Sequence, residues 1–213
     1  MANIWIVRDD YYHPKEVVDP FFARIFEKSG HQVHWRDNLK TVTAASETVD
    51  LLILCSTGRN DGQEDVTHED KEVIAEMVSK GMGLLFFHSG CVLVDKADAF
   101  YQKLNSGRFV AHSDGLGQVR TTPLRNIKEH PILKGVQEIS GLDEHYFCEV
   151  EADQIDALMI SSSKDVSSLG CWCSQYGLGR TVVSLPGHTP KILTNQNLVQ
   201  LIKNAVVWCL VKE

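Results

Sequence analysis

His88 occupies the most chemically informative position in the sequence. The apolar residues 84–87 have the pattern of a short buried strand, and Ser89 and Gly90 follow directly, so the chain is expected to turn sharply into a helix here. Enzymes that carry a nucleophile at such a turn use a G-x-S-x-G pattern or its cysteine counterpart. Alignment of Gly90 with the second glycine puts His88 in the nucleophile's place, with Ser89 and Cys91 out of register. The sequence therefore predicts no glutamine amidotransferase activity.

Further polar residues are expected at the same edge of the sheet. Ligands of open α/β sheets bind beyond the carboxyl ends of the strands. His13 follows the first predicted strand, His188 follows the last one, and Glu144 lies in a turn-rich segment. Tyr146 and Phe147 follow Glu144 closely in the sequence, and apolar bulk raises the pKa of a carboxyl group toward the range of general acid–base catalysis. We expect His88, Glu144 and His188 to be catalytic.

A second set of residues is assigned to substrate binding. This set comprises His13, Ser89, His112 and Tyr146. A lone histidine after a strand is more often hydrogen-bonded to a local carbonyl than catalytic, so His13 and His112 receive only this subordinate role.

Three histidines and a carboxylate would also suffice as the first shell of a divalent ion such as zinc. If a metal is bound, the expected ligands are His88, His112, Glu144 and His188. No contiguous ligand motif such as H-E-x-x-H occurs in the chain. The preferred interpretation is therefore a metal-free acid–base set, with no cofactor assigned and zinc as the alternative.

Alternating strand and helix patterns are expected to position these residues. Strands are expected at 3–7, 32–35, 50–55, 84–87, 157–161, 170–175 and 181–185. Asp19 and Pro20 predict the start of a first helix, Thr67 opens a second through a capping box, and a helix over 198–210 closes the chain. Turn residues cluster between 105 and 152, which predicts a loop-rich insertion. The pattern indicates one α/β domain over residues 1–213, with a doubly wound, mainly parallel sheet.

Composition narrows the classes of partner. The chain of 213 residues has 43% hydrophobic and 23% charged residues, and its net charge is -7 with no basic run. We therefore expect neither a nucleic-acid nor a membrane partner. No apolar window approaches ~20 residues and the chain begins directly with a strand, which favours a cytoplasmic protein. The six cysteines lack C-x-x-C spacing and are expected to be reduced, apolar residues.

Several motifs occur in an order typical of a known family. In chain order they are Leu85-Phe86-Phe87-His88-Ser89-Gly90, Gly107-Arg108-Phe109-Val110-Ala111-His112, His130-Pro131-Ile132, Asp143-Glu144-x-Tyr146, Tyr176-Gly177-x-Gly179-Arg180, Pro186-Gly187-His188 and Ala205-Val206-Val207-Trp208. Together they resemble the ThuA-like (trehalose-utilisation) family of the class I glutamine amidotransferase-like superfamily. The resemblance implies a flavodoxin-like fold that lacks the amidotransferase nucleophile.

The resemblance also implies a role in disaccharide or keto-sugar catabolism. A ketone acidifies the neighbouring C–H of a 3-keto-glycoside, so a histidine or glutamate base could start an isomerisation or an elimination-type cleavage of the glycosidic bond. Two alternatives stay open: a divalent-metal-dependent sugar-transforming hydrolase and a non-catalytic sugar-binding protein. The expected partner is a small sugar, and a homo-oligomer stays open as well.

Overall fold

The computed structural model describes all residues except 46, 61–62, 65, 125–128, 165 and 212–213. Among the described residues the largest sheet has nine strands. Their spatial order is β2 (Gln32–Arg36), β1 (Asn3–Val7), β3 (Leu51–Leu54), β6 (Gly83–Phe87), β13 (Gly179–Ser184), β12 (Val166–Tyr176), β11 (Asp156–Ser163), β8 (Gly117–Pro123) and β9 (Ile139–Asp143). Two small sheets pair β7 (Gly107–His112) with β10 (Tyr146–Val150) and β4 (Arg59–Asn60) with β5 (Gln63–Glu64).

The helices are short segments that connect or flank these strands. They are α1 (Lys15–Phe26), α2 (Lys40–Thr43), α3 (His68–Ser79), α4 (Pro190–Leu193) and α5 (Gln196–Leu210), with 3₁₀ segments η1 (His88–Leu93) and η3 (Pro131–Leu133) and a π-helical segment η2 (Phe100–Asn105). No helix in the described ranges is long and apolar enough to cross a membrane.

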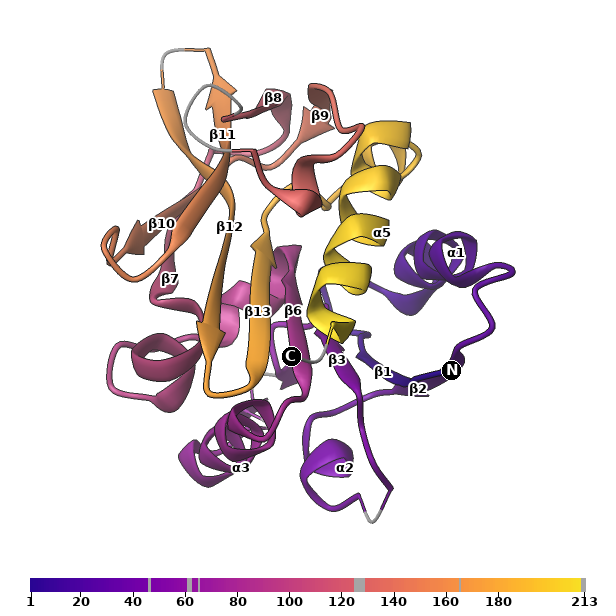
Figure 1. Cartoon of the computed structure of the whole chain (residues 1–213). Coiled ribbons are helices and arrows are strands. Elements are labelled where there is room, and N and C mark those ends of the chain that lie inside the picture. The colour runs from indigo at the N-terminus through magenta and orange to yellow at the C-terminus, as the bar shows by residue number, and fades with distance from the viewer. Residues whose placement is uncertain (46, 61–62, 65, 125–128, 165, 212–213) are drawn as a thin grey trace.

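The half of the sheet from β2 to β13 is parallel, and its strands β1, β3, β6 and β13 are mostly buried on both faces, whereas the edge strand β2 is partly exposed. In β1, Ile4 and Ile6 pack under α1 and α5, whereas Trp5 and Val7 point to the opposite face, where α2, α3 and η2 lie. This arrangement is visible in Figure 1, with α1 and α5 on one side and α2 and α3 on the other. Because successive strand residues point to opposite faces, a fully apolar strand needs helices on both. The doubly wound α/β fold is confirmed.

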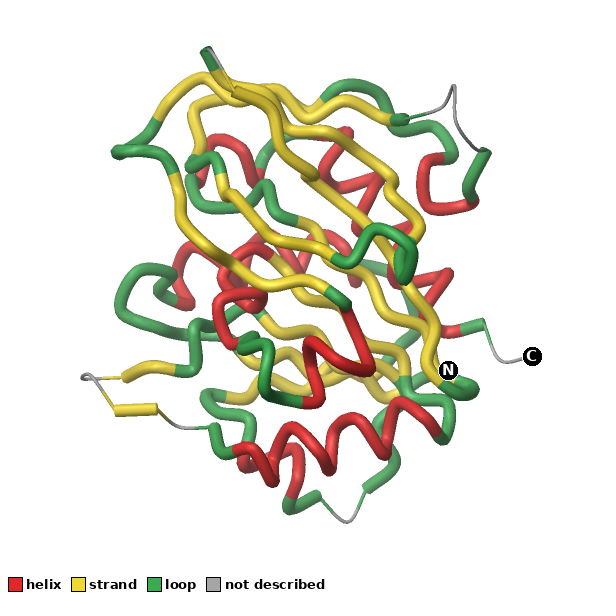
Figure 2. Tube along the Cα trace, turned by 90° about the vertical axis from the view of Figure 1, so that its left-hand side faces the viewer, coloured by secondary structure: helices red, strands yellow, loops and turns green. Residues whose placement is uncertain are grey.

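The other half of the sheet is antiparallel, and the sequence predicted its strands at 157–161 and 170–175 but not β8 and β9. The strands β12, β11, β8 and β9 pair antiparallel in succession. Two of them, β8 and β9, come from the segment expected to be loop-rich, and they extend the sheet in the strand-rich upper part of Figure 2. In β8, Val119 and Thr121 are buried between more exposed neighbours, the alternation of a strand with one covered face.

The two predicted helix starts have different outcomes. The first helix begins at Lys15, earlier than Asp19 and Pro20 predicted; Pro20 lies inside it on the exposed side, where water can satisfy the carbonyl that the missing N–H leaves unbonded. The capping box of α3 is confirmed: Thr67 Oγ1 accepts the backbone N–H of Asp70 at 3.1 Å, and Asp70 Oδ2 accepts that of Thr67 at 3.0 Å.

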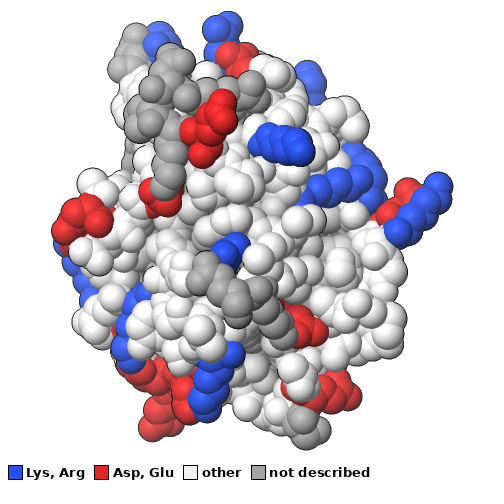
Figure 3. All heavy atoms as spheres, viewed as in Figure 1, with Lys and Arg blue, Asp and Glu red and all other residues white. Residues whose placement is uncertain are grey.

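Charges of both signs are interspersed over the surface. On the face shown in Figure 3, basic and acidic side chains lie among large uncharged areas, and no continuous basic patch is visible among the described residues there.

Candidate metal centre

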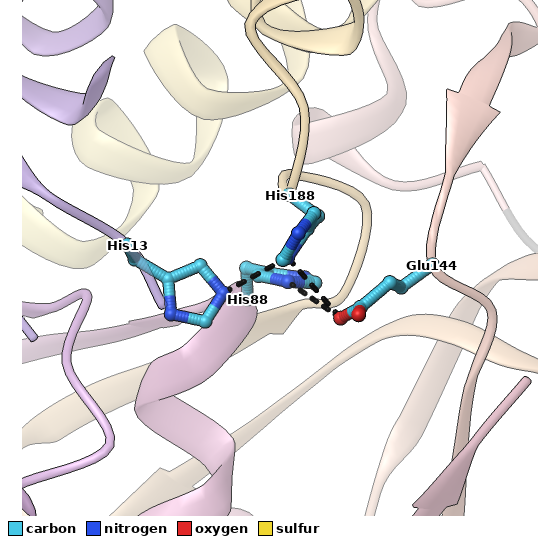
Figure 4. Close-up of side chains that lie close together, drawn as sticks. All are labelled: His13, His88, Glu144 and His188. Carbon is cyan, nitrogen blue, oxygen red and sulfur yellow. Dashed lines mark hydrogen bonds and ion pairs between the residues drawn. The ribbon is translucent and has the colours of Figure 1, made fainter. Parts of the chain in front are cut away.

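Four side chains meet at the carboxyl edge of the parallel strands (Figure 4). His13 follows β1, His88 follows β6 and His188 follows β13, while Glu144 lies between β9 and β10. One nitrogen or carboxylate oxygen from each of them lies within 4.8 Å of all the others. We call these four residues the His₃Glu group. Since parallel strands end at one edge of a sheet, residues far apart in sequence converge here.

His88 sits on a strained turn between β6 and η1. Its φ of 42° is in the left-handed region, which a non-glycine residue rarely adopts. A Cβ on Gly90 would lie 2.1 Å from the carbonyl oxygen of Leu54, so only glycine fits there. The Nδ1–H of His88 donates to the carbonyl of Leu185 at 2.6 Å, and Nε2 is buried without a hydrogen-bond partner among the described residues. Burial lowers the pKa of His88 well below its usual value, which keeps the ring neutral.

His13 is held by the carboxylate of Asp10. Asp10 Oδ1 accepts the ring Nδ1–H of His13 at 2.9 Å and its backbone N–H at 2.8 Å, while Oδ2 accepts the N–H of Thr57 at 2.7 Å. Burial acts to raise the pKa of Asp10, but the bonds from His13 and Thr57 outweigh it and hold the pKa below its usual value. Asp10 is therefore an anion, and it fixes His13 with Nε2 toward the centre of the group.

The remaining two members are joined directly. His188 Nδ1 lies 3.1 Å from Glu144 Oε2 and 3.1 Å from His13 Nε2. The hydrogen bond with Glu144 raises the pKa of His188. The loop is anchored by Asp143, whose carboxylate accepts the backbone N–H groups of Gly187 at 3.0 Å and His188 at 2.9 Å. Burial raises the pKa of Asp143 to about 6 against the effect of these bonds.

The acceptor atoms of the His₃Glu group outnumber the protons available to them. His13 and His88 both donate through Nδ1, so each directs Nε2 at the centre, and the neutral ring of His88 presents a lone pair there. Without a cation, one proton on His188 Nδ1 is shared between His13 Nε2 and Glu144 Oε2, and His88 Nε2 faces the same carboxylate oxygen at 3.8 Å. The arrangement could be satisfied by a cation bound to all four atoms.

The distances fit a small divalent ion. Ligand atoms ~2.1 Å from a tetrahedral centre lie about 3.4 Å from one another. Three of the separations within the group, 3.1, 3.1 and 3.8 Å, bracket that value, and the others are at most 4.8 Å. His13 and His88 also have the support usual for metal-bound histidines, since their other ring nitrogens bond to Asp10 and to the Leu185 carbonyl.

The other expected site residues lie around this group. His112 is exposed at the end of β7 and donates through Nδ1 to the Ser113 carbonyl, so His13 and not His112 completes the set of four. The ring of Tyr146 stacks on His88 at 4.3 Å between centroids and lies 6.1 Å from the ring of His112. Ser89 is buried in η1 beside His88.

Asp10 and Asp143 support the site through His13 and His188, but the sequence analysis gave no role to them or to the neighbouring His145. The ring of His145 lies between two hydroxyl groups, with Nδ1 2.7 Å from Ser163 Oγ and Nε2 2.8 Å from Ser168 Oγ. Burial lowers the pKa of His145. The spacing Asp10-x-x-His13 was the available signal for Asp10, because a carboxylate three residues before a histidine can bond back to it across a turn.

A second cluster consists of His130, Asp156 and Cys173, whose potential ligand atoms lie within 4.8 Å of one another. His130 Nδ1 accepts the backbone N–H of Ile132 at 3.2 Å, which places the ring proton on Nε2, 3.6 Å from Cys173 Sγ. That tautomer donates toward the cluster and does not ligate a metal there. His130 acts as the N-cap of η3, in keeping with its place before Pro131.

Comparisons with known proteins agree with the fold. A family model described as ThuA, trehalose utilisation, matches residues 3–209. No curated protein matches the chain significantly. A ThuA-like protein from Bacteroides uniformis is similar in structure, with a TM-score of 0.76 and 16% identity over 98% of this chain and 90% of that one. A ThuA-like protein from Parabacteroides merdae has a TM-score of 0.74 and 14% identity, over 99% and 90%.

A part of a larger protein is also similar. The β-galactosidase from Bacillus circulans sp. alkalophilus has a TM-score of 0.67 and 11% identity, over 99% of this chain and 31% of that chain. At such low identities these three likenesses concern the fold.

Proposed function

The chain belongs to the ThuA family, described as trehalose utilisation, and on this premise we propose that it is a divalent-metal-dependent enzyme of disaccharide catabolism. Its substrate would be a sugar or a 3-keto-glycoside. The observation that carries the proposal is the His₃Glu group, in which three imidazole nitrogens and one carboxylate oxygen lie within 4.8 Å of one another.

The donor set favours a particular class of ion. Imidazole suits zinc, iron, nickel and copper, and one carboxylate beside three imidazoles keeps the site compatible with zinc and manganese. Magnesium and calcium prefer shells made of oxygen atoms alone. Zinc is accordingly the first ion to test.

Access to the group is one-sided. The side chains of Glu144 and His188 are 15% and 22% exposed, whereas those of His88 and His13 are only 1% and 6% exposed. Substrate would therefore approach past Glu144 and His188. An ion held there would supply Lewis acidity toward a sugar carbonyl or hydroxyl.

A proton acceptor is available next to the group. His112 donates through Nδ1 to the Ser113 carbonyl, which leaves a lone pair on Nε2 that can take a proton from substrate. Its ring lies beside Tyr146, whose own ring covers His88. We assign His112 as the base candidate and Tyr146 as the wall of the binding site.

Metal analysis tests the assignment of ligands. Purified protein is stripped with a chelator, reloaded with zinc, desalted and measured by elemental analysis. We expect about one equivalent in the wild type and in His112→Ala, and a loss of bound zinc in His13→Ala and His188→Ala. His112→Ala is the matched control, because it removes a nearby imidazole outside the His₃Glu group. Zinc that stays stoichiometric in both ligand variants would overturn the proposal.

A metal-free acid–base enzyme is the second candidate. It is favoured by the direct contact of His188 Nδ1 and Glu144 Oε2 at 3.1 Å, which could act as a coupled acid and base. Release of glucose from 3-keto-trehalose, measured before and after exhaustive chelation, separates the two. Turnover that survives chelation with a bell-shaped pH dependence supports the metal-free enzyme.

A further inference from the structure

The ring of His188 is oriented differently from the other two rings of the His₃Glu group. In His13 and His88 the Nδ1–H donates to acceptors of the protein, so Nε2 is the nitrogen that faces the group. In His188 the nitrogen inside the group is Nδ1, which lies 3.1 Å from His13 Nε2 and 3.1 Å from Glu144 Oε2. Its Nε2 is therefore on the far side of the ring, directed away from the group.

The close approach of the segment after β13 explains why this ring uses Nδ1. A Cβ on Gly187 would lie 2.7 Å from the ring of Phe87 and 3.0 Å from Cβ of His88, so only glycine fits there. The next residue, His188, is fixed by its backbone N–H, which donates to Asp143 at 2.9 Å. The backbone of His188 is thus held close to the group, and Nδ1, the ring nitrogen nearer to the backbone, is the one that reaches it.

The Nε2 atom of His188 faces solvent. It has no hydrogen-bond partner among the described residues, and it is not one of their buried unpartnered atoms, unlike Nε2 of His88. The side chain of His188 is also the most exposed of the four. This nitrogen therefore lies on the side from which a substrate would approach.

A cation bound at Nδ1 would decide where the proton of this ring lies. A neutral imidazole has a single N–H, so a ring whose Nδ1 lone pair binds an ion carries its proton on Nε2. The positive charge of the ion also draws electron density from the ring, which makes that N–H a stronger hydrogen-bond donor. A polar hydrogen would then point to the open side of the group, close to the ion.

We propose that His188 has two roles, in which Nδ1 binds the ion and the Nε2–H donates a hydrogen bond to an oxygen of the substrate. The inference rests on the proposed function and adds a substrate-binding donor to it. It favours substrates with two neighbouring oxygen atoms, one for the ion and one for this N–H, as in a hydroxy-ketone or a vicinal diol. His13 and His88 cannot take the second role, because their other ring nitrogens are bonded within the protein.

NMR of the histidine rings tests which nitrogen carries the proton. Zinc-loaded protein with isotope-labelled histidine is measured by long-range proton–nitrogen correlation, and His188→Asn and His13→Gln identify the two sets of signals. We expect the proton on Nε2 of His188 and on Nδ1 of His13 in the zinc-loaded wild type. A proton on Nδ1 of His188 in that sample would overturn the inference.

Amide variants test the ligand atom with ordinary substitutions. The side-chain oxygen of asparagine can take the place of Nδ1, and that of glutamine, which is one bond longer, can take the place of Nε2. Competition with a chelator should show that His188→Asn binds zinc at least ~5-fold more tightly than His188→Gln. At His13, which uses Nε2, the order should reverse. The same order at both positions would contradict the assignment of Nδ1.

Methylation of one nitrogen isolates the donor. His188→Nε2-methylhistidine, introduced through an expanded genetic code, keeps the Nδ1 lone pair and removes the N–H. Its zinc content should equal that of the wild type. It should bind acetohydroxamate, which has two neighbouring oxygen atoms, at least ~5-fold more weakly, and ethanethiol, which has no oxygen, within ~2-fold of the wild type. The control is His68→Nε2-methylhistidine, at an exposed position of α3, which should change neither affinity.

The outcomes separate this inference from the proposed function. A wild type that binds no zinc overturns both. Zinc that is lost from the His188 methyl variant overturns the second role of His188 alone, because it shows that Nε2 is the ligand. With zinc retained, acetohydroxamate binding that is unchanged, or that weakens no more than ethanethiol binding, overturns the hydrogen bond to substrate.

Discussion

The Nε2 atom of His88 lies 3.8 Å from Oε2 of Glu144, and the two side chains are only 1% and 15% exposed. His88 is neutral and its proton is on Nδ1, so a lone pair faces a carboxylate across this gap. Two electron-rich groups held together by the fold repel each other unless a cation lies between them. This contact therefore supports the proposed metal site over the metal-free acid–base set that the sequence favoured.

The affinity for zinc should fall steeply as the pH is lowered. Metal binding requires neutral imidazoles, and Glu144 raises the pKa of His188 above its usual ~6.5. His188 in the metal-free protein is therefore protonated first as the pH falls, and competition with zinc begins above the usual histidine range. Competition with a chromophoric chelator between pH 5 and 8.5 measures this. A flat profile over that range would contradict it.

Asp10→Asn should weaken zinc binding without removing a ligand. The amide keeps one acceptor oxygen, but its NH₂ group would face either the N–H of Thr57 or the N–H groups of His13, and the support of His13 is lost. Loss of such support usually costs about 10–100-fold in metal affinity. The control is Asp19→Asn, which changes a carboxylate that pairs with Arg8 instead. Equal affinities in the two variants would show that Asp10 has no such role.

Gly90→Ala should destabilise the protein by at least ~2 kcal/mol. The new methyl group would lie 2.1 Å from the Leu54 carbonyl oxygen, and a backbone atom in the centre of a sheet cannot move aside cheaply. The control is Gly117→Ala, where no atom lies within 4 Å of the added carbon. Urea unfolding followed by circular dichroism gives both free energies of unfolding, and similar values for the two variants would count against the close approach at the elbow.

Glutamine should not be hydrolysed. His88 stands where amidotransferases have their nucleophile, and burial raises the pKa of the Cys91 thiol well above its usual value, so a thiolate does not form there. Ammonia release from glutamine is measured before and after alkylation of thiols, with an active glutaminase as positive control. Turnover that alkylation abolishes would restore a cysteine mechanism, with Cys91 as its candidate.

The sequence predicted the parallel half of the fold well because buried parallel strands are continuous apolar runs. Residues 51–54 and 84–87 are such runs and were predicted as strands. Residues that follow parallel strands meet at one edge of the sheet. This is why His88 and His188 could be placed from the sequence. The antiparallel half was predicted only in part: strands were expected at 157–161 and 170–175, whereas β8 and β9 lie among turn residues and depend on pairing with other strands.

The sequence analysis expected His112 as the fourth member of a metal site, whereas the structure has His13 in that place. This difference shows the limit of such predictions. The orientation of His13 depends on the turn at Asp9, where φ is 80°, and on the bond that Asp10 accepts from its ring. The position of His112 depends on its pairing with Tyr146, next to a β-bulge between Phe147 and Cys148. A positive φ at an aspartate and a bulge have no local sequence signature as clear as an apolar run.

The contact between His13 and His188 spans 175 positions of the chain. During synthesis His13 therefore has no His188 to contact until the residues between them have been made. An ion bound by both would close a loop of that length, much as a disulfide does, and would stabilise the finished protein by lowering the entropy of its unfolded chain wherever the ion stays attached. A chain truncated before His188 could not complete the centre, because it would lack one of the four members of the His₃Glu group.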